Sequence, residues 1–345
     1  RYSTPTERCS TSSHLTNKQL AMKKDQVRII FYGTAPFATA CLERLVDESY
    51  PIVAVVTAPD KPAGRGHRLQ PSAVKVCATK LGLPILQPTN LRDEAFVQQL
   101  TELKPTLGVV VAFRMLPREV WSLPPWGTVN IHGSLLPQYR GAAPINWALI
   151  NGESETGVTL FQLRHEIDTG DIIAASACPI ESEDNFGTLY DKLMALGAEL
   201  LAHGLSLLMQ HEGRYPQALP QVERPDLRPA PKLTKENTRI DWHQSAHEIH
   251  NLVRGLAPQP GAWTMLELPN EEPLLVKIYA TTLPQQGAGE RPVGQSLSPH
   301  KGQLAVQCGD GLLLIDQLKP QGKKLLSARD WLNGLKVSVE EVRFV

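Results

Sequence analysis

Three polar residues, Asn130, His132 and Asp168, could together carry out acyl transfer. Asn130 and His132 stand two positions apart in "TVNIH", and alternate residues of a strand face the same side. The asparagine amide can donate a hydrogen bond to a developing oxyanion, and the histidine can move protons near neutral pH. Asp168 follows in "IDTGD", where a carboxylate could orient and tune the imidazole. We therefore expect the three side chains to meet at one site, although taken singly the histidine and the aspartate also suit purely structural roles.

The segments that must position these residues predict an α/β fold. Apolar strands are expected at 26–34, 50–58, 106–113 and 126–134, with helical patterns between them. Strands that alternate with helices in this way predict a parallel sheet covered on both faces. Ligands of such sheets bind at the carboxyl ends of the strands, which is where Gly33 and the Asn130–His132 pair fall.

A second, smaller domain is predicted further along the chain. Residues 211–232 are rich in proline and lack periodicity, which is typical of a linker. Beyond them, short apolar runs separated by glycine-containing turns predict a small β-barrel or sandwich. We expect an amino-terminal extension at 1–21, a catalytic domain at 22–210, the linker at 211–232 and a second domain at 233–345.

Composition excludes several classes of protein. No apolar run approaches the ~20 residues that a membrane helix needs, and a formal net charge of zero argues against bulk electrostatic binding of nucleic acid. The five cysteines are scattered without a Cys-x-x-Cys, which suits reduced thiols and gives no support for a zinc site or a disulfide framework. No Gly-x-Gly-x-x-Gly follows the first strand, and Gly-x-Ser-x-Gly and His-Glu-x-x-His are absent.

The first 21 residues bear on the cellular compartment. They are rich in Ser and Thr and contain no apolar core of the kind found in a secretory signal. A disordered tail or an extension upstream of Met22 is the simpler interpretation, and a bacterial cytoplasmic location is then expected. An organellar transit remnant is the alternative, and it would place the protein in the mitochondrial matrix.

One long stretch carries a family resemblance. "VNIHGSLLPQYRGAAPINWALINGESETGVTLFQL" followed by "IDTGD" resembles the signature of the 10-formyltetrahydrofolate-dependent formyltransferases, Asn-x-His-x-Ser-Leu-Leu-Pro with a downstream Asp-Thr-Gly. The similarity extends through "PDKPAGRGHRLQPSAVKVCA" and "KLTKENTRIDW" to "GKKLLSARDWLNG", so that it covers nearly all of residues 23–340. The chain is therefore similar to this family over both expected domains.

The resemblance implies a fold and a reaction. The fold would be a Rossmann-like parallel-sheet domain followed by a small OB-like β-barrel. The reaction would move the formyl group of 10-formyltetrahydrofolate, a co-substrate, to the α-amine of methionine on initiator tRNA, with no metal and in a monomer. The family's catalytic trio corresponds to Asn130, His132 and Asp168. Its tetrahydrofolate-contacting loop corresponds to Ser134, Leu135, Leu136 and Pro137.

The tRNA partner is expected to meet two groups of basic residues. The glycine-rich loop 60–69 resembles the loop with which family members that act on tRNA enter the acceptor stem, although a loop of this kind can also be merely solvated. Lysines in "LKPQGKKLL" could add phosphate contacts. The candidate tRNA-binding residues are Lys61, Arg65, Arg68, Lys319, Lys323 and Lys324.

The chain also departs from the family pattern and leaves other functions open. An Ala-Pro pair at 35–36 replaces the usual Pro-(Asp/Glu), and Phe113–Met115 differ near the expected pterin pocket. A formyltransferase acting on an amino-sugar nucleotide shares much of the motif, but the basic loop and Ala142 argue against it. A formyltetrahydrofolate hydrolase could use water in the same chemistry. A non-catalytic RNA-binding module conflicts with the presence of all three polar residues.

Overall fold

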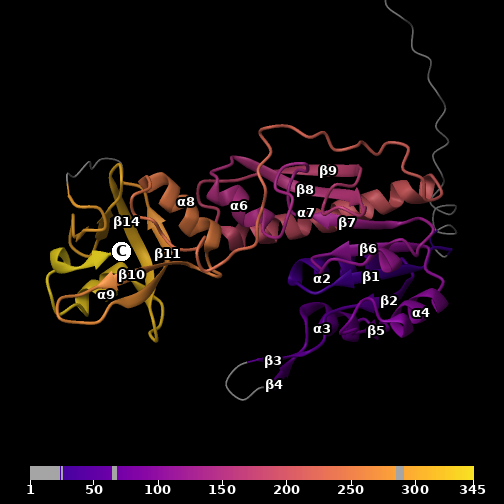
Figure 1. Cartoon of the computed structure of the whole chain (residues 1–345), viewed down its shortest axis with the longest axis horizontal. Helices are drawn as coiled ribbons and strands as arrows, with labels where there is room; N and C mark the ends of the chain where they lie inside the picture. Colours follow the sequence, from indigo (N-terminus) through magenta and orange to yellow (C-terminus); the bar gives the residue numbers. More distant parts are fainter. Residues whose placement is uncertain (1–23, 25, 64–67, 285–290) are drawn as a thin grey trace, which may run out of the picture. The chain divides into compact units, whose positions relative to one another are not determined.

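The computed structural model describes residues 24, 26–63, 68–284 and 291–345 (Figure 1). The predicted extension at 1–21 and the predicted tRNA contact Arg65 lie outside these residues. The chain divides into two compact units. One consists of the residues up to Val129 together with Leu201–Ala218, and the other of Asn130–Leu200 together with Leu219–Val345.

A mixed seven-stranded sheet confirms the predicted α/β class. Its strands are Ile29–Gly33 (β1), Ile52–Val56 (β2), Ile85–Leu86 (β5), Leu107–Val111 (β6), Thr128–His132 (β7), Glu155–Gln162 (β8) and Ile172–Pro179 (β9), in the order β5-β2-β1-β6-β7-β8-β9. β1 pairs in parallel with β2 and β6, and all five of its residues are buried, as expected for an apolar central strand. β8 and β9 pair antiparallel, which the alternation of helices and strands did not predict.

Helices alternate with the strands in the first part of the chain. They are Pro36–Asp47 (α2), Ala73–Lys80 (α3), Glu94–Glu102 (α4), Arg118–Trp121 (α5), Pro144–Ile150 (α6) and Phe186–Gln210 (α7). Ser72 and Asp93 cap α3 and α4 with their side-chain oxygens. Pro36 occupies the first turn of α2, where a proline costs no hydrogen bond, so the displaced proline of the Ala-Pro pair starts a helix.

Within the described residues, α7 is the one helix long and apolar enough to span a bilayer by length and composition. More than half of its most apolar window is buried inside the protein, and Leu189, Leu193 and Leu205 are fully buried. A buried face of this kind is typical of a core helix, which agrees with the leucine spacing in the sequence.

The carboxy-terminal strands form the predicted small barrel. They are Ala262–Glu267 (β10), Leu274–Thr282 (β11), Ser296–Leu297 (β12), Leu304–Gln307 (β13), Leu312–Pro320 (β14), Leu326–Ser327 (β15) and Arg343–Phe344 (β16), in the order β12-β13-β14-β11-β10-β16 with β15 beside β14. A bridge between Gln295 and Arg343 joins the two ends of this order, which nearly closes the sheet. Trp242, Leu318 and Phe344 lie in its buried core.

Three short helices accompany the barrel: Ala246–Leu256 (α8), Ala328–Asn333 (α9) and the 3₁₀ turn Val339–Glu341 (η1). α8 begins with a reciprocal capping box between Ser245 and Glu248, and it packs against β11 and α6. Before this cap the chain from 241 to 244 forms a local turn, in which Asp241 accepts hydrogen bonds from His243.

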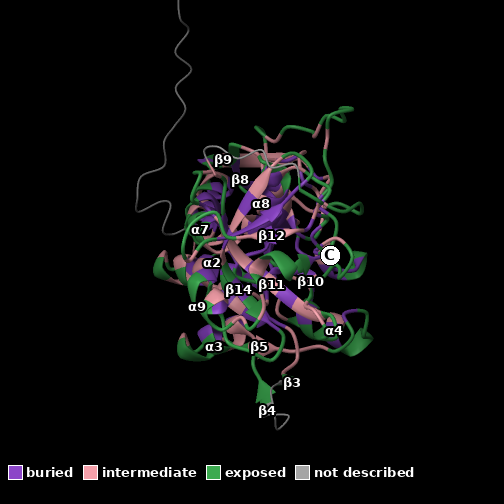
Figure 2. Cartoon of the chain, turned by 90° about the vertical axis from the view of Figure 1, so that its left-hand side faces the viewer, coloured by how far each residue is buried: buried purple, intermediate pink, exposed green. Residues whose placement is uncertain are grey.

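Two short paired strands flank the basic loop that the sequence singled out, whose residues 64–67 lie outside the described residues. Lys61–Ala63 (β3) pairs antiparallel with Arg68–Gln70 (β4). The hairpin projects from its unit in Figure 1, and Figure 2 shows exposed residues along β4. Lys61 is exposed at its base.

Candidate active site

The strand β7 brings two of the predicted catalytic residues to the same side of the sheet, because Asn130 and His132 alternate along it. Asn130 is half-buried, and its Oδ1 is buried without a hydrogen-bond partner among the described residues. His132 is only 6% exposed. An unpaired buried amide oxygen is costly, so the Asn130 side chain is available to a bound molecule that can pair with it.

The hydrogen-bond partner of His132 determines which ring nitrogen carries the hydrogen. Its Nε2 lies 2.8 Å from the carbonyl oxygen of Tyr139. A carbonyl can only accept, so Nε2 carries the hydrogen and donates it, which leaves Nδ1 to gain or lose a proton. Nδ1 lies 3.8 Å from Oδ2 of Asp168. The edge of the Phe161 ring meets the imidazole at an interplanar angle of 86°, which restricts its rotation.

Asp168 lies in the connection between β8 and β9, in a left-handed backbone conformation with φ of 54°. Its Oδ2 accepts a hydrogen bond of 3.0 Å from the backbone N–H of Gly141. Oδ2 therefore lies between Gly141 and His132. The structure thus brings Asp168 to His132, with the carboxylate facing the imidazole nitrogen that can be protonated, and Asn130 stands two residues before His132 on β7.

The loop after β7 is held by its own polar contacts. Tyr139 has a φ of 61°, and its hydroxyl donates to Glu153 and accepts from Asn151. Burial, together with the carboxylate of Glu153, raises the pKa of the Tyr139 hydroxyl, so this group stays protonated as a donor. Because the Tyr139 carbonyl also accepts from His132, this anchoring fixes the imidazole.

The predicted folate loop is partly enclosed by protein. Ser134 is fully buried, and its hydroxyl donates to the carbonyl of Gln138 at 2.6 Å. Thr159 on β8 donates to the Ser134 carbonyl and accepts from the Leu136 N–H. The side chains of Leu135 and Pro137 are the more exposed members of the predicted set.

Residues Phe113–Met115, which depart from the family pattern, make local contacts or face solvent. Arg114 donates to the carbonyls of Pro88 and Thr89, and Met115 is 70% exposed. The Phe113 ring packs at a tilt against Tyr32, with centroids 6.0 Å apart.

The described cysteines are free and buried. Burial raises the pKa of the Cys41 thiol to about 12 and that of Cys77 to about 11, so neither is an activated nucleophile. Within the described residues, no group of three or more His, Cys, Asp or Glu side chains is arranged to hold a metal ion.

The barrel presents cations in an ordered row. Lys319 on β14 is exposed and lies in register with Lys277 on β11, which in turn pairs with Trp263 on β10. Lys323 and Lys324 are exposed in the turn that follows. The ammonium of Lys277 donates to the carbonyl oxygen of Pro260, so the exposed lysines Lys319, Lys323 and Lys324 are the ones available to an anionic partner. Lys277 and Trp263 were not predicted as candidates, although the two-residue alternation in their strands would have placed both outward.

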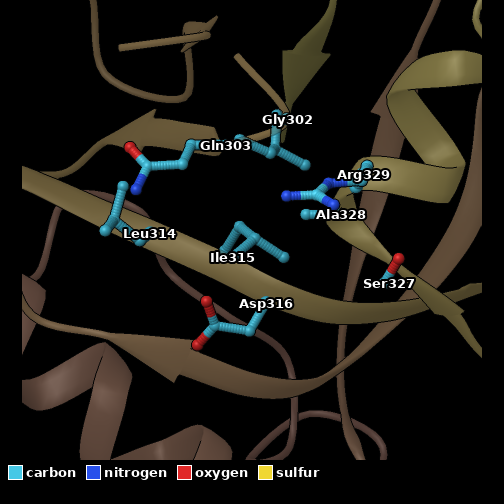
Figure 3. A pocket seen from close by; sticks show the side chains of 9 residues that line it. Gly302, Gln303, Leu314, Ile315, Asp316, Ser327, Ala328 and Arg329 are labelled. Carbon is cyan, nitrogen blue, oxygen red and sulfur yellow. The ribbon is translucent and has the colours of Figure 1, made fainter. Parts of the chain in front are cut away.

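A separate pocket of about 370 Å³ opens on the barrel near β14 and the start of α9. Figure 3 shows Arg329, Asp316 and Gln303 around it. None of the predicted site residues lines it. The catalytic candidates therefore belong to a different site.

Comparison with known proteins agrees with this geometry. Residues 26–205 match the formyl transferase family, and residues 232–336 match the formyl transferase carboxy-terminal domain. A methionyl-tRNA formyltransferase from Porphyromonas gingivalis is 48% identical over 320 residues, which cover 92% of this chain and 98% of that protein. The chain belongs to the methionyl-tRNA formyltransferase family.

Solved structures of lower identity share the fold. A structure of HypX from Aquifex aeolicus in complex with tetrahydrofolic acid has a TM-score of 0.61 at 20% identity, over 90% of this chain and 48% of that one. An N-formyltransferase from Helicobacter canadensis, in complex with folinic acid and dTDP-3-aminofucose, has a TM-score of 0.62 at 20% identity, over 84% of this chain and 98% of that one. These two structures share the fold of this chain, in which Asn130, His132 and Asp168 are the candidate residues for acyl transfer.

Proposed function

We propose that this protein transfers the formyl group of 10-formyltetrahydrofolate to the α-amine of methionine on initiator tRNA, which prepares that tRNA for translation initiation. The observation that carries the proposal is the Asn130–His132–Asp168 arrangement in a chain 48% identical to a methionyl-tRNA formyltransferase over nearly its full length. 10-Formyltetrahydrofolate supplies the formyl carbon as a co-substrate.

The residues of the chain have distinct parts in the proposed reaction. The amide of Asn130 donates to the formyl oxygen as negative charge develops on it, and a preformed donor of this kind is typically worth about 10²–10³ in rate. His132, when protonated at Nδ1, carries a positive charge next to the reacting carbon. The amine nitrogen attacks the formyl carbon, and the bond from that carbon to N10 of the folate then breaks. Asp168 stabilises the charge on His132 and, through water, helps to pass the proton that the amine loses to N10, so that tetrahydrofolate leaves as the neutral amine. The amine needs little activation, because a free α-amine has a pKa of roughly 7.7–8.0.

For the folate, the loop Ser134–Pro137 is the proposed contact. The hydroxyl of Ser134 and the backbone of Leu136 are already paired within the protein. We therefore assign contact with the ligand mainly to the side chains of Leu135 and Pro137 and to the amide of Asn130, whose oxygen is unpaired.

For the tRNA, the proposed contacts are the β3–β4 hairpin and the cationic row of the barrel. Lys61 is exposed on β3, and Arg68 begins β4. On the barrel, Lys319 is exposed on β14, and its register partner Lys277 on β11 donates to the carbonyl of Pro260. Lys235 and Arg239 lie over the ring of Trp263 on β10 and add two cations to this face, which would attract phosphates. The further proposed members are Arg65, Lys323 and Lys324.

The proposed organisation is a monomer with a catalytic domain at 22–210 and a tRNA-binding domain at 233–345, in the cytoplasm of a bacterium.

The alternative function is formylation of an amino-sugar nucleotide. Two solved structures of N-formyltransferases, one of them in complex with an amino-sugar nucleotide, are only 20% identical to this chain. A competition assay with radiolabelled 10-formyltetrahydrofolate decides between the two. Label is expected on initiator methionyl-tRNA even with an amino-sugar nucleotide in excess. Label found only on the sugar, or absent from the tRNA, would overturn the proposal.

A further inference from the structure

The segment that the sequence marks as a linker takes part in building the site. Residues 218–230, here called the strap, lie against the two loops that carry the catalytic candidates. Leu219 exchanges two backbone hydrogen bonds with Ile172, of 2.8 and 2.9 Å. Further along, the carbonyl of Arg228 accepts from the N–H of Tyr139 at 2.8 Å, and Ala230 pairs with Arg140. The strap is therefore fixed at both ends.

Gln221 lies between these anchors, and both the nitrogen and the oxygen of its side-chain amide form hydrogen bonds. Its Nε2 donates to the carbonyl oxygens of Asp168 and Gly170, each at 2.8 Å. Its Oε1 accepts from Nε of Arg140 at 2.9 Å. One half-buried amide thus joins the turn that contains Asp168 to the loop that follows His132.

The turn needs such support. Asp168 has a left-handed backbone, a conformation that a residue with a side chain holds only when its surroundings impose it. Gly170 is equally constrained, since a Cβ there would lie 1.5 Å from the carbonyl oxygen of Gln162. The two carbonyls that Gln221 holds flank this turn, and Gly141, next to Arg140, donates to the Asp168 carboxylate.

We propose that Gln221 is a positioning residue, which holds the Asp168 carboxylate toward Nδ1 of His132 by locking the 168–170 turn to Arg140. The inference rests on the proposed formyl transfer. Gln221 touches neither substrate nor the reacting atoms, and it acts through Asp168. Its loss lets the carboxylate move away from the imidazole, and a displacement of about 1 Å in such a pair can lower a rate by about 100-fold.

The test uses the full chain with initiator methionyl-tRNA and 10-formyltetrahydrofolate. Gln221→Ala is expected to lower kcat by about 10- to 100-fold, with the KM values for both substrates changed by less than about twofold. Gln221→Glu keeps the acceptor for Arg140 but places an oxygen against two carbonyls, so its kcat is expected to fall at least as far. Melting curves establish that both variants are folded.

A double-mutant cycle separates positioning from a general structural role. In an Asp168→Asn background, Gln221→Ala is expected to cost less than about twofold in kcat, because the carboxylate through which Gln221 acts is gone. Glu223→Gln is the matched control. It removes an exposed ion-pair partner of the same Arg140 from the same strap, and kcat should stay at the level of the unsubstituted protein.

The outcomes are distinguishable. If the unsubstituted protein fails to formylate methionyl-tRNA, the proposed function is wrong. If it is active and folded Gln221→Ala retains full kcat, or if the two losses multiply in the double variant, Gln221 is not a positioning residue for Asp168.

Discussion

His132 and Asp168 face each other over 3.8 Å from Nδ1 to Oδ2, while Nε2 of the same imidazole donates to the carbonyl of Tyr139. The hydrogen bond from Nε2 determines which ring nitrogen can take up a proton next to Asp168. Because a carbonyl oxygen can only accept, Nε2 keeps its hydrogen, and any further proton on the ring must lie at Nδ1, toward the carboxylate. A single nitrogen of His132, Nδ1, therefore holds the proton that gives the ring its positive charge in the proposed reaction.

This assignment predicts different effects for two amide replacements at His132. The side-chain amide of Asn reaches the position of Nδ1, whereas that of Gln reaches the position of Nε2. His132→Gln is expected to lose about 10²–10⁴ in kcat, as His132→Ala does, while His132→Asn retains more activity than either. Steady-state formylation of methionyl-tRNA measures this order, and a His132→Gln variant more active than His132→Asn would assign the chemistry to Nε2.

Asn130→Ala tests the proposed oxyanion donor. Because the Asn130 amide is poised at the end of β7 without a protein partner for its oxygen among the described residues, the variant should fold normally. Its kcat is expected to fall by about 10²–10³, and binding of tRNA should be nearly unchanged. The binding is measured by filter retention. A variant with full kcat would remove Asn130 from the catalytic machinery.

The β7 residues and the Asp168 loop show what the sequence could and could not predict. Apolar runs such as β1 predicted their strands directly, and the structure contains the strand β7 on which the two-residue spacing of Asn130 and His132 predicts that both face one side. The role of Gln221 could not be predicted in this way. It donates to backbone carbonyls 51 and 53 positions away, and because every residue has a backbone carbonyl, such partners cannot be recognised from the amino-acid sequence.

The antiparallel pair β8 and β9 at one end of the sheet also could not be predicted from the sequence. β8 and β9 interrupt the alternation of helices and strands, and β9 consists largely of small residues with few that are buried. Its pairing with β8 depends on partners elsewhere in the fold, which a local pattern cannot supply. The sequence also could not show that the Tyr139 carbonyl holds His132, because this partner too is a backbone group.

Gly141→Ala should destabilise the loop that supports Asp168. Gly141 has a φ of 128°, and a Cβ there would lie 2.4 Å from the carbonyl oxygen of Ala230. We expect a decrease of about 2–4 kcal/mol in the free energy of unfolding, measured by urea denaturation. Gly322→Ala is the matched control, since its φ is 76° and no atom lies within 4 Å of the new Cβ. It should cost about 1 kcal/mol, and equal decreases in the two variants would show that the close approach to Ala230 is unimportant.

Asp184 predicts a pH dependence of stability. Burial acts to raise the pKa of its carboxyl, but hydrogen bonds from Lys192, Thr188 and the N–H of Glu181 outweigh it and hold the pKa below the ordinary 3.8. A lowered folded-state pKa stabilises the protein above the unfolded-state value, and this stabilisation is lost as the pH falls through the folded-state value. Asp184→Asn should therefore destabilise the protein at pH 7, and the difference should shrink below pH 3.8. Urea denaturation at several pH values measures it, and a difference that grows on acidification contradicts the assignment.

The cationic row on the barrel predicts a salt-dependent defect. Replacing Lys319, Lys323 and Lys324 with Ala should weaken tRNA binding and reduce the slope of log K against log salt concentration by about 0.7–0.9 for each phosphate that these lysines neutralise. The KM for 10-formyltetrahydrofolate should not change. Lys80→Ala, on the exposed last turn of α3, is the control for the effect of removing one lysine charge elsewhere, against which the effect per lysine is compared. An unchanged slope in the triple variant would exclude this row from the interface.

The strap changes where this protein can be divided. A fragment that ends at residue 210 retains Asn130, His132 and Asp168 but lacks the hydrogen bonds that Gln221 makes to the 168–170 turn and those that Ala230 makes to the loop after β7. Such a fragment would hold every reacting group and yet be a poor enzyme. The functional border of the catalytic domain therefore lies after Ala230, and any hybrid that joins this domain to a foreign carboxy-terminal module should carry the strap with it.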